Sequence, residues 1–193
     1  MPMHHAFLGL LARAARGRWT DAPEPVGISG EAGPVAEPAA QPAPAGGPTV
    51  VRMETTKGDV VMELHDEDAP NTVQNFVDLV NKQFYDGLTF HRYVAGFVIQ
   101  GGDPDGTGGG GPGHTIKLEI GKEKHLKGTL GMARTPDPDS AGSQFYICLA
   151  DTPSLDGQYA TFGHVTQSMD VVEQLRKGDA MTRVWVDGKP AGA

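Results

Sequence analysis

The chain has 193 residues, enough for one domain with a sizeable hydrophobic core and an additional tail. Its 16 basic and 24 acidic side chains give a net charge of -8, which argues against nucleic acid as the main partner because phosphate binding needs a basic face. The single cysteine, Cys148, excludes an internal disulfide and fits a reducing compartment.

Residues 1–48 differ in composition from the rest of the chain. They hold eight of its 15 prolines, together with many alanines and glycines, and residues 20–48 show no apolar periodicity. Such a segment buries too little apolar surface to offset the entropy cost of ordering it. We therefore predict a disordered or weakly ordered extension over residues 1–48 and a single domain over residues 49–193.

Within this extension, residues 6–15 form a short apolar run that Arg13 interrupts. The run is too short to span a bilayer, and its basic residues lie within or after it, whereas a signal peptide carries them before its apolar run. A surface-lying helix, a partner-binding helix and a mis-assigned start codon remain open. We expect a cytoplasmic monomer without stable membrane insertion; the alternative is export or membrane association through the extension.

From Thr49 onward the pattern becomes regular. Residues 50–55 and 59–65 resemble strands joined by a tight turn at Lys57-Gly58. Pro70 suits the first turn of a helix whose apolar residues recur at helical spacing, and Ser168 is a candidate cap of a second helix. Further strands are predicted over residues 129–133, 144–149, 161–165 and 181–186. Many short strands with two helices predict an antiparallel barrel or sandwich.

The segment over residues 90–103 combines a cation, an apolar run and a neutral amide. Arg92 carries a permanent charge, residues 97–99 have strand character, and Gln100 both donates and accepts hydrogen bonds. In a strand, Val98 and Gln100 project from the same face. From the pattern alone, two interpretations stay open: an apolar pocket with a cation and an amide at its rim, or a core strand with a solvated arginine.

Three motifs in order resemble the cyclophilin-type peptidyl-prolyl cis-trans isomerases over about residues 49–186. The first comprises Phe90-His-Arg, Gly96-Phe and Gln100-Gly-Gly-Asp. The second runs from Gly128 through Met132-Ala133 and continues at Gly142-Ser-Gln-Phe-Tyr-Ile, and the third is Leu155-Asp-Gly followed by Phe162-Gly. The resemblance implies a mainly β fold, namely a closed eight-stranded antiparallel barrel capped by two α-helices.

The resemblance also implies an activity: rotation about Xaa-Pro peptide bonds, which assists protein folding, with proline-containing peptides and unfolded or partly folded proteins as partners. A proline-peptide-binding module or holdase without turnover is the competing hypothesis. Arg92, Phe97 and Gln100 match the family's catalytic positions. Substrate-binding positions are matched by Val98, Met132, Ala133, Arg134, Gln144, Tyr146, Leu155 and Tyr159.

Several of these residues depart from the pattern of many family members. Tyr146 replaces a phenylalanine, which adds a hydroxyl that needs a partner or water. Arg134 stands where an asparagine is common, and Tyr159 where a histidine is common. Ser154 occupies the position of a tryptophan on which cyclosporin binding draws, so the resemblance implies weak binding of that inhibitor.

Neither a cofactor nor a metal is expected. Residues 106–111 match a dinucleotide fingerprint literally, but Pro112-Gly113 follows and no helix begins there to receive a pyrophosphate. The seven histidines lack metal-site spacing, and no His-Glu-x-x-His motif occurs. Cys148 lies in an apolar strand pattern, which predicts an inert buried thiol.

Overall fold

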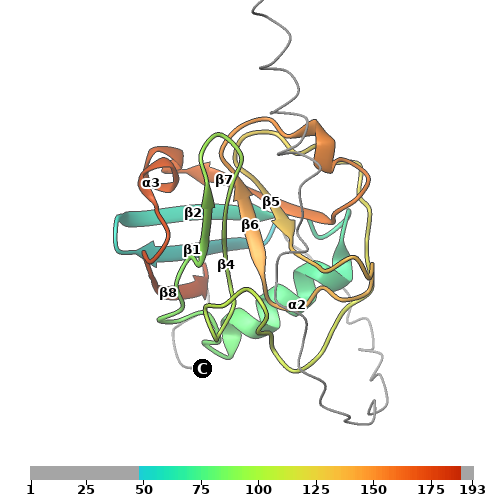
Figure 1. The fold of residues 1–193 in the computed structure, drawn as a ribbon, viewed down its shortest axis with the longest axis horizontal. Helices are drawn as coiled ribbons and strands as arrows, with labels where there is room; N and C mark the ends of the chain where they lie inside the picture. Colours follow the sequence, from blue (N-terminus) through green and yellow to red (C-terminus); the bar gives the residue numbers. More distant parts are fainter. Residues whose placement is uncertain (1–47, 188–193) are drawn as a thin grey trace, which may run out of the picture. The chain divides into compact units, whose positions relative to one another are not determined.

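A computed structural model describes residues 48–187 of the chain (Figure 1). The predicted extension over residues 1–48 therefore lies outside the described part, except for Pro48, and stays a prediction. The elements in chain order are β1 (Val50–Thr55), β2 (Gly58–Leu64), α2 (Pro70–Asn81), β3 (Arg92–Val94), β4 (Val98–Gly101), β5 (Thr129–Met132), β6 (Phe145–Cys148), the 3-10 turn η1 (Pro153–Leu155), β7 (Thr161–Gln167), α3 (Met169–Gln174) and β8 (Met181–Val186).

These bounds confirm most of the elements expected from the sequence. β1 and β8 coincide with the predicted ranges, and the other predicted strands differ by no more than two residues at either end. α2 begins at Pro70, as its missing N–H and fixed φ favour. β3 and the turn η1 were not predicted, because three-residue elements carry too little periodicity to be recognised from the sequence.

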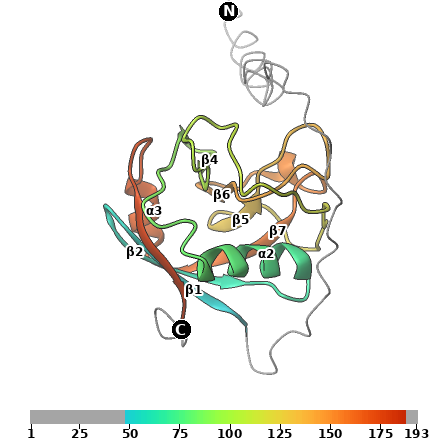
Figure 2. The same cartoon turned by 90° about the horizontal axis from the view of Figure 1, so that it is seen from below.

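The eight strands form one antiparallel sheet in the order β3-β4-β6-β5-β7-β2-β1-β8, which confirms a mainly β fold with two helices. The predicted closed barrel is wrong, because the edge strands β3 and β8 share no ladder and the sheet is open and curled (Figures 1 and 2). Instead, the chain before β3 meets the chain before β8 at the Thr89–Ala180 bridge.

The two helices cover different parts of this sheet. α2 packs against β8 and α3 against β2, and the two lie well apart in Figure 1. From α2, the Phe76 ring reaches the core, where its centroid lies 5.4 Å from that of Phe145 on β6 and 5.1 Å from that of Phe162 on β7. Aromatic pairs at this spacing add to the stabilisation that burial provides. No helix within residues 48–187 has the length and apolarity needed to cross a membrane.

Ser168 precedes α3 as expected, but its side chain makes no capping hydrogen bond, so that detail of the prediction is wrong. Its backbone adopts a left-handed conformation with φ of 66°, whereas a capping side chain normally requires an extended backbone. The Ser168 carbonyl instead accepts the backbone N–H groups of Val171 and Val172 at 3.0 and 3.3 Å.

A residue distant in sequence caps α2. Glu119, in the long connection between β4 and β5, accepts the backbone N–H groups of Asn71 and Thr72 at 3.2 and 2.7 Å. Its negative charge also suits the positive end of the helix dipole. Asn75 of α2 donates to the Gly142 carbonyl at 2.8 Å. These bonds attach α2 to the connections that flank the candidate site.

Candidate active site

Strand register brings four residues of different chemistry into one row. Arg92 on β3 lies opposite Gln100 on β4, and Gln100 lies opposite Tyr146 on β6. Tyr146 in turn lies opposite Gly131 on β5. Directly opposed residues of neighbouring strands project from the same face of a sheet. We call Arg92, Gln100, Tyr146 and Gly131 the cross-strand row.

The alternate residues of the same strands face the hydrophobic core. Ile99, Leu130 and Ile147 have no exposed surface and belong to the core cluster. Met132 also belongs to it, with 1% of its surface exposed and Phe145 as its cross-strand partner. Of the residues predicted to bind substrate, Met132 therefore lies in the layer behind the cross-strand row, whereas Val98 shares the face of Gln100.

Gln100 is linked to the glycine-rich connection through Gln144. The Gln100 Nε2 donates to Gln144 Oε1 at 2.9 Å, and Gln144 Nε2 donates to the carbonyls of Gly108 and Gly110, both at 2.9 Å. Gln100 is 4% exposed, and its Oε1 has no hydrogen-bond partner within residues 48–187. The cross-strand row therefore contains a buried amide oxygen that no group within residues 48–187 satisfies.

The buried carboxylate of Asp103 holds the same glycine-rich connection. It accepts the backbone N–H of Asp105 at 2.8 Å and that of Gly108. Burial alone would raise the pKa of Asp103, but the backbone N–H groups of Asp105, Gly108 and Gly110 outweigh it, so the pKa is lowered. No helix begins at residues 106–111, and hydrogen bonds with Asp103 and Gln144 hold this segment in place.

A second arginine, Arg134, and Tyr159 lie beside the cross-strand row, whose own cation is Arg92. Burial lowers the pKa of the half-buried Arg92 guanidinium, and the nearby Tyr159 opposes this shift. Arg134 lies over the Tyr159 ring, 4.9 Å from its centroid, and donates to the Gln158 carbonyl at 3.1 and 2.7 Å. Because a guanidinium stays protonated in proteins, Arg92 presents a cation in partly desolvated surroundings.

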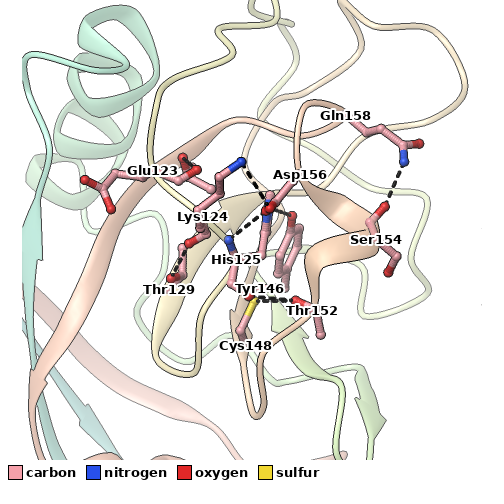
Figure 3. A network of polar contacts seen from close by, with 11 residues as sticks. Glu123, Lys124, His125, Thr129, Tyr146, Cys148, Thr152, Ser154, Asp156 and Gln158 are labelled. Atoms are coloured by element: carbon pink, nitrogen blue, oxygen red, sulfur yellow. Dashed lines mark hydrogen bonds and ion pairs between the residues drawn. The ribbon is translucent and has the colours of Figure 1, made fainter.

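The Tyr146 hydroxyl has a protein partner. Its oxygen lies 2.9 Å from His125 Nε2, and His125 Nδ1 lies 2.9 Å from Asp156 Oδ1 (Figure 3). The backbone N–H of His125 donates to the same Asp156 oxygen at 2.9 Å, and Lys124 Nζ lies 3.4 Å from Asp156 Oδ2. Burial raises the pKa of Tyr146 well above its usual 10.0 and lowers that of His125, so both side chains are neutral near pH 7.

The remaining predicted residues lie around this group. Phe97 is half-buried in the turn between β3 and β4, where Gly96 has a positive φ of 67°. Leu155 ends η1 and is 5% exposed. Ala133 donates its backbone N–H to the Gln144 carbonyl at 2.9 Å. The Tyr159 ring meets that of Tyr146 edge-on, with centroids 6.1 Å apart.

Sequence reasoning missed two residues of this arrangement, His125 and Asp156. The one available signal was the extra hydroxyl on Tyr146, which required a buried partner. Nothing in the spacing identifies that partner, since His125 lies 21 positions before Tyr146 in an irregular connection. Only the path of the connection after Glu119 brings the imidazole under the tyrosine.

Other reactive or ligating groups lie elsewhere in the described part of the chain. Cys148 is buried, as predicted, and burial raises the pKa of its thiol to about 11, which disfavours the nucleophilic thiolate. His65, Asp68 and Glu123 each offer one ligand atom, and these atoms lie within 4.8 Å of one another. The His65 Nε2 already lies 2.7 Å from His164 Nδ1. This group is the arrangement among the described residues that a metal ion would fit.

Comparisons with known proteins agree on one family. The model of the cyclophilin type peptidyl-prolyl cis-trans isomerases matches residues 50–190. A peptidyl-prolyl cis-trans isomerase of Synechococcus elongatus is 51% identical over 134 residues, which cover 68% of this chain and 92% of that protein. One of Helicobacter pylori is 46% identical over 136 residues, covering 68% of this chain and 83% of that protein.

Solved structures show the same likeness. The crystal structure of a cyclophilin type peptidyl-prolyl cis-trans isomerase of Cryptosporidium parvum matches with a TM-score of 0.69 and 31% identity, over 74% of this chain and 99% of that one. The same protein in the presence of the dipeptide Ala-Pro matches with a TM-score of 0.68 and 30% identity, over 72% of this chain and 99% of that one. With the three sequence motifs, these matches show that the chain belongs to the cyclophilin-type peptidyl-prolyl cis-trans isomerase family.

Proposed function

We propose that this protein is a peptidyl-prolyl cis-trans isomerase that rotates Xaa-Pro bonds and so assists protein folding. The observation that carries the proposal is the cross-strand row, in which a partly desolvated cation, Arg92, lies opposite the amide of Gln100, and Gln100 in turn lies opposite the aromatic residue Tyr146. Membership of the family supports it independently.

The chemistry requires no nucleophile, because no covalent bond breaks. The barrier of about 18–20 kcal/mol comes from the partial double bond of the amide. When the bond twists, the proline nitrogen becomes pyramidal and regains a lone pair. The Arg92 guanidinium donates a hydrogen bond to that nitrogen in the twisted state, where it accepts better than in either planar state. Only such a difference in binding lowers the barrier.

Around this cation, the other residues bind the peptide. Phe97, Val98, Tyr146 and Leu155 provide the apolar and aromatic surface for the pyrrolidine ring, and Met132 packs behind them in the core. Gln100 Oε1 and its partner Gln144 hold the peptide backbone, and Ala133, Arg134 and Tyr159 contact residues that flank proline. The Cryptosporidium relative crystallised in the presence of Ala-Pro supports proline-containing peptides as ligands of this site.

The experiment is a protease-coupled isomerisation assay on an Xaa-Pro peptide, comparing wild type with Arg92→Ala. Removing a charged hydrogen bond from the transition state should lower kcat/KM by about 10- to 150-fold. Arg52→Ala is the matched control, because Arg52 lies on β1 and pairs with Asp187 at 3.0 Å. Equal turnover by wild type and Arg92→Ala would contradict the mechanism.

A second candidate is a proline-peptide-binding module or holdase without turnover. That function would need the apolar surface but not a cation aimed at the bond, so the place of Arg92 in the row favours the enzyme. The same assay separates the two, since a binding module would retain peptide without accelerating isomerisation. We further propose a domain that folds without residues 1–48, acts as a monomer in the cytoplasm and needs no cofactor.

A further inference from the structure

Two neighbours, His125 and Gly131, hold the hydroxyl end of the Tyr146 side chain. Its hydroxyl reaches His125, as Figure 3 shows, and neither residue exposes more than 1% of its surface. Its ring lies directly over Gly131, so closely that a Cβ atom on Gly131 would lie 2.6 Å from Tyr146 Cε2. The ring therefore has little freedom to shift along or away from the sheet.

The direction of the hydrogen bonds follows from Asp156. The pKa of this carboxyl is lowered, first by the hydrogen bond from the His125 backbone and then by that from the His125 side chain, so it is ionised and accepts only. His125 Nδ1 must carry the proton that it donates to Asp156. In the neutral imidazole, Nε2 is then an acceptor, and the Tyr146 hydroxyl donates to it.

The same carboxylate reaches two parts of the candidate site. Asp156 directly follows Leu155, the last residue of η1, and it binds both the backbone and the ring of His125. The His125 carbonyl in turn accepts the backbone N–H of Thr152 at 2.7 Å. His125 therefore positions two parts of the candidate site at once: the connection that carries Leu155, and the ring of Tyr146.

We propose that His125 and Asp156 are positioning residues for proline binding: they hold the Tyr146 ring against Gly131 and keep its hydroxyl out of the apolar surface that receives the pyrrolidine. The inference rests on the proposed isomerase function and adds two residues to it. A phenol donating to His125 leaves only its apolar ring for the substrate. Without His125, the buried hydroxyl would lose its acceptor at Nε2, and the ring would turn to find another.

The test compares His125→Leu in two backgrounds, wild type and Tyr146→Phe, by measuring kcat and KM separately on an Xaa-Pro peptide. In the wild-type background, KM should rise about tenfold, because a buried hydroxyl loses its acceptor. The fall in kcat should be smaller than this rise in KM. In the Tyr146→Phe background, the same change should alter KM by less than about threefold relative to that background, since no hydroxyl remains to be satisfied.

Val172→Ala in α3 is the stability control, since it truncates a fully buried core residue away from this network. It should lower the free energy of unfolding without raising KM. The ¹⁵N chemical shifts of the His125 imidazole are a second measurement, made on wild type and independent of whether any variant folds. They should report a neutral ring with the proton on Nδ1.

Three results would overturn the inference: an imidazole protonated on Nε2 alone, an unchanged KM in a folded His125→Leu variant, or an equal rise of KM in both backgrounds. An equal rise would mean that His125 acts without the Tyr146 hydroxyl. An inactive wild type would instead overturn the proposed function. The two failures are therefore distinguishable.

Discussion

Replacing Gly131 by alanine would force Tyr146 out of its place in the cross-strand row. The added Cβ would lie 2.6 Å from Tyr146 Cε2, whereas ordinary contacts begin at 3.4 Å, so the ring must move by close to 1 Å. Gly131 does not have a left-handed backbone, so alanine fits its conformation and the effect is steric. Overpacking of this kind costs about 1–3 kcal/mol of stability, and a 1 Å misplacement can cost about 100-fold in activity.

The assay pairs denaturant unfolding with kcat/KM for Gly131→Ala in the wild-type and Tyr146→Ala backgrounds. Removing the ring should abolish the stability penalty of Gly131→Ala, giving a coupling free energy of at least about 1 kcal/mol. Gly111→Ala is the control, since a Cβ there meets nothing within 4 Å. A Gly131→Ala variant with wild-type unfolding free energy and wild-type kcat/KM would refute the reasoning.

Four further predictions concern the chain as a whole. A chain beginning at Pro48 should keep its melting temperature and activity, and a large drop in melting temperature would show that the extension docks. Activity should survive exhaustive chelation; loss with chelator and recovery with one metal would direct attention to His65, Asp68 and Glu123. Wild type should bind cyclosporin weakly and Ser154→Trp more tightly, as side-by-side affinity measurements would decide. Finally, burial lowers the pKa of His125 below 6.5 despite the nearby Asp156, so the unfolded chain binds a proton on His125 more tightly than the folded chain does. The free energy of unfolding should therefore be greatest above pH 6.5 and fall as the pH drops below it. Denaturant unfolding at several pH values should show a smaller fall in His125→Leu.

The sequence by itself determined those helix and strand bounds that depend on only a few neighbouring residues. The bounds of β1 and β8 followed from their strand-like residue pattern, and the start of α2 followed from Pro70. Both signals act over a few neighbouring residues: the alternation of side chains along a strand, and the fixed φ of proline. The three motifs, around Arg92, Met132 and Leu155, together carried the family resemblance. These features were predictable because each depends on neighbours along the chain.

Tertiary structure decided how distant strands align. The sequence supplied Arg92, Gln100 and Tyr146, but only the register of β3, β4 and β6 sets them opposite one another. It likewise decided that β3 and β8 leave the sheet open, since closure depends on how two strands far apart in the sequence come together. Neither fact follows from a local pattern, because register is set jointly by all the strands of a sheet.

The partner of the Tyr146 hydroxyl shows the same division. The sequence showed that a buried phenol would need an acceptor, because an unsatisfied buried hydroxyl is costly. Which acceptor it finds depends on an irregular connection. Glu119 attaches this connection to the start of α2, and the backbone N–H of His125 attaches it to Asp156 after η1. Such a connection has no period to read, so the position of His125 beneath Tyr146 is a property of the folded chain alone.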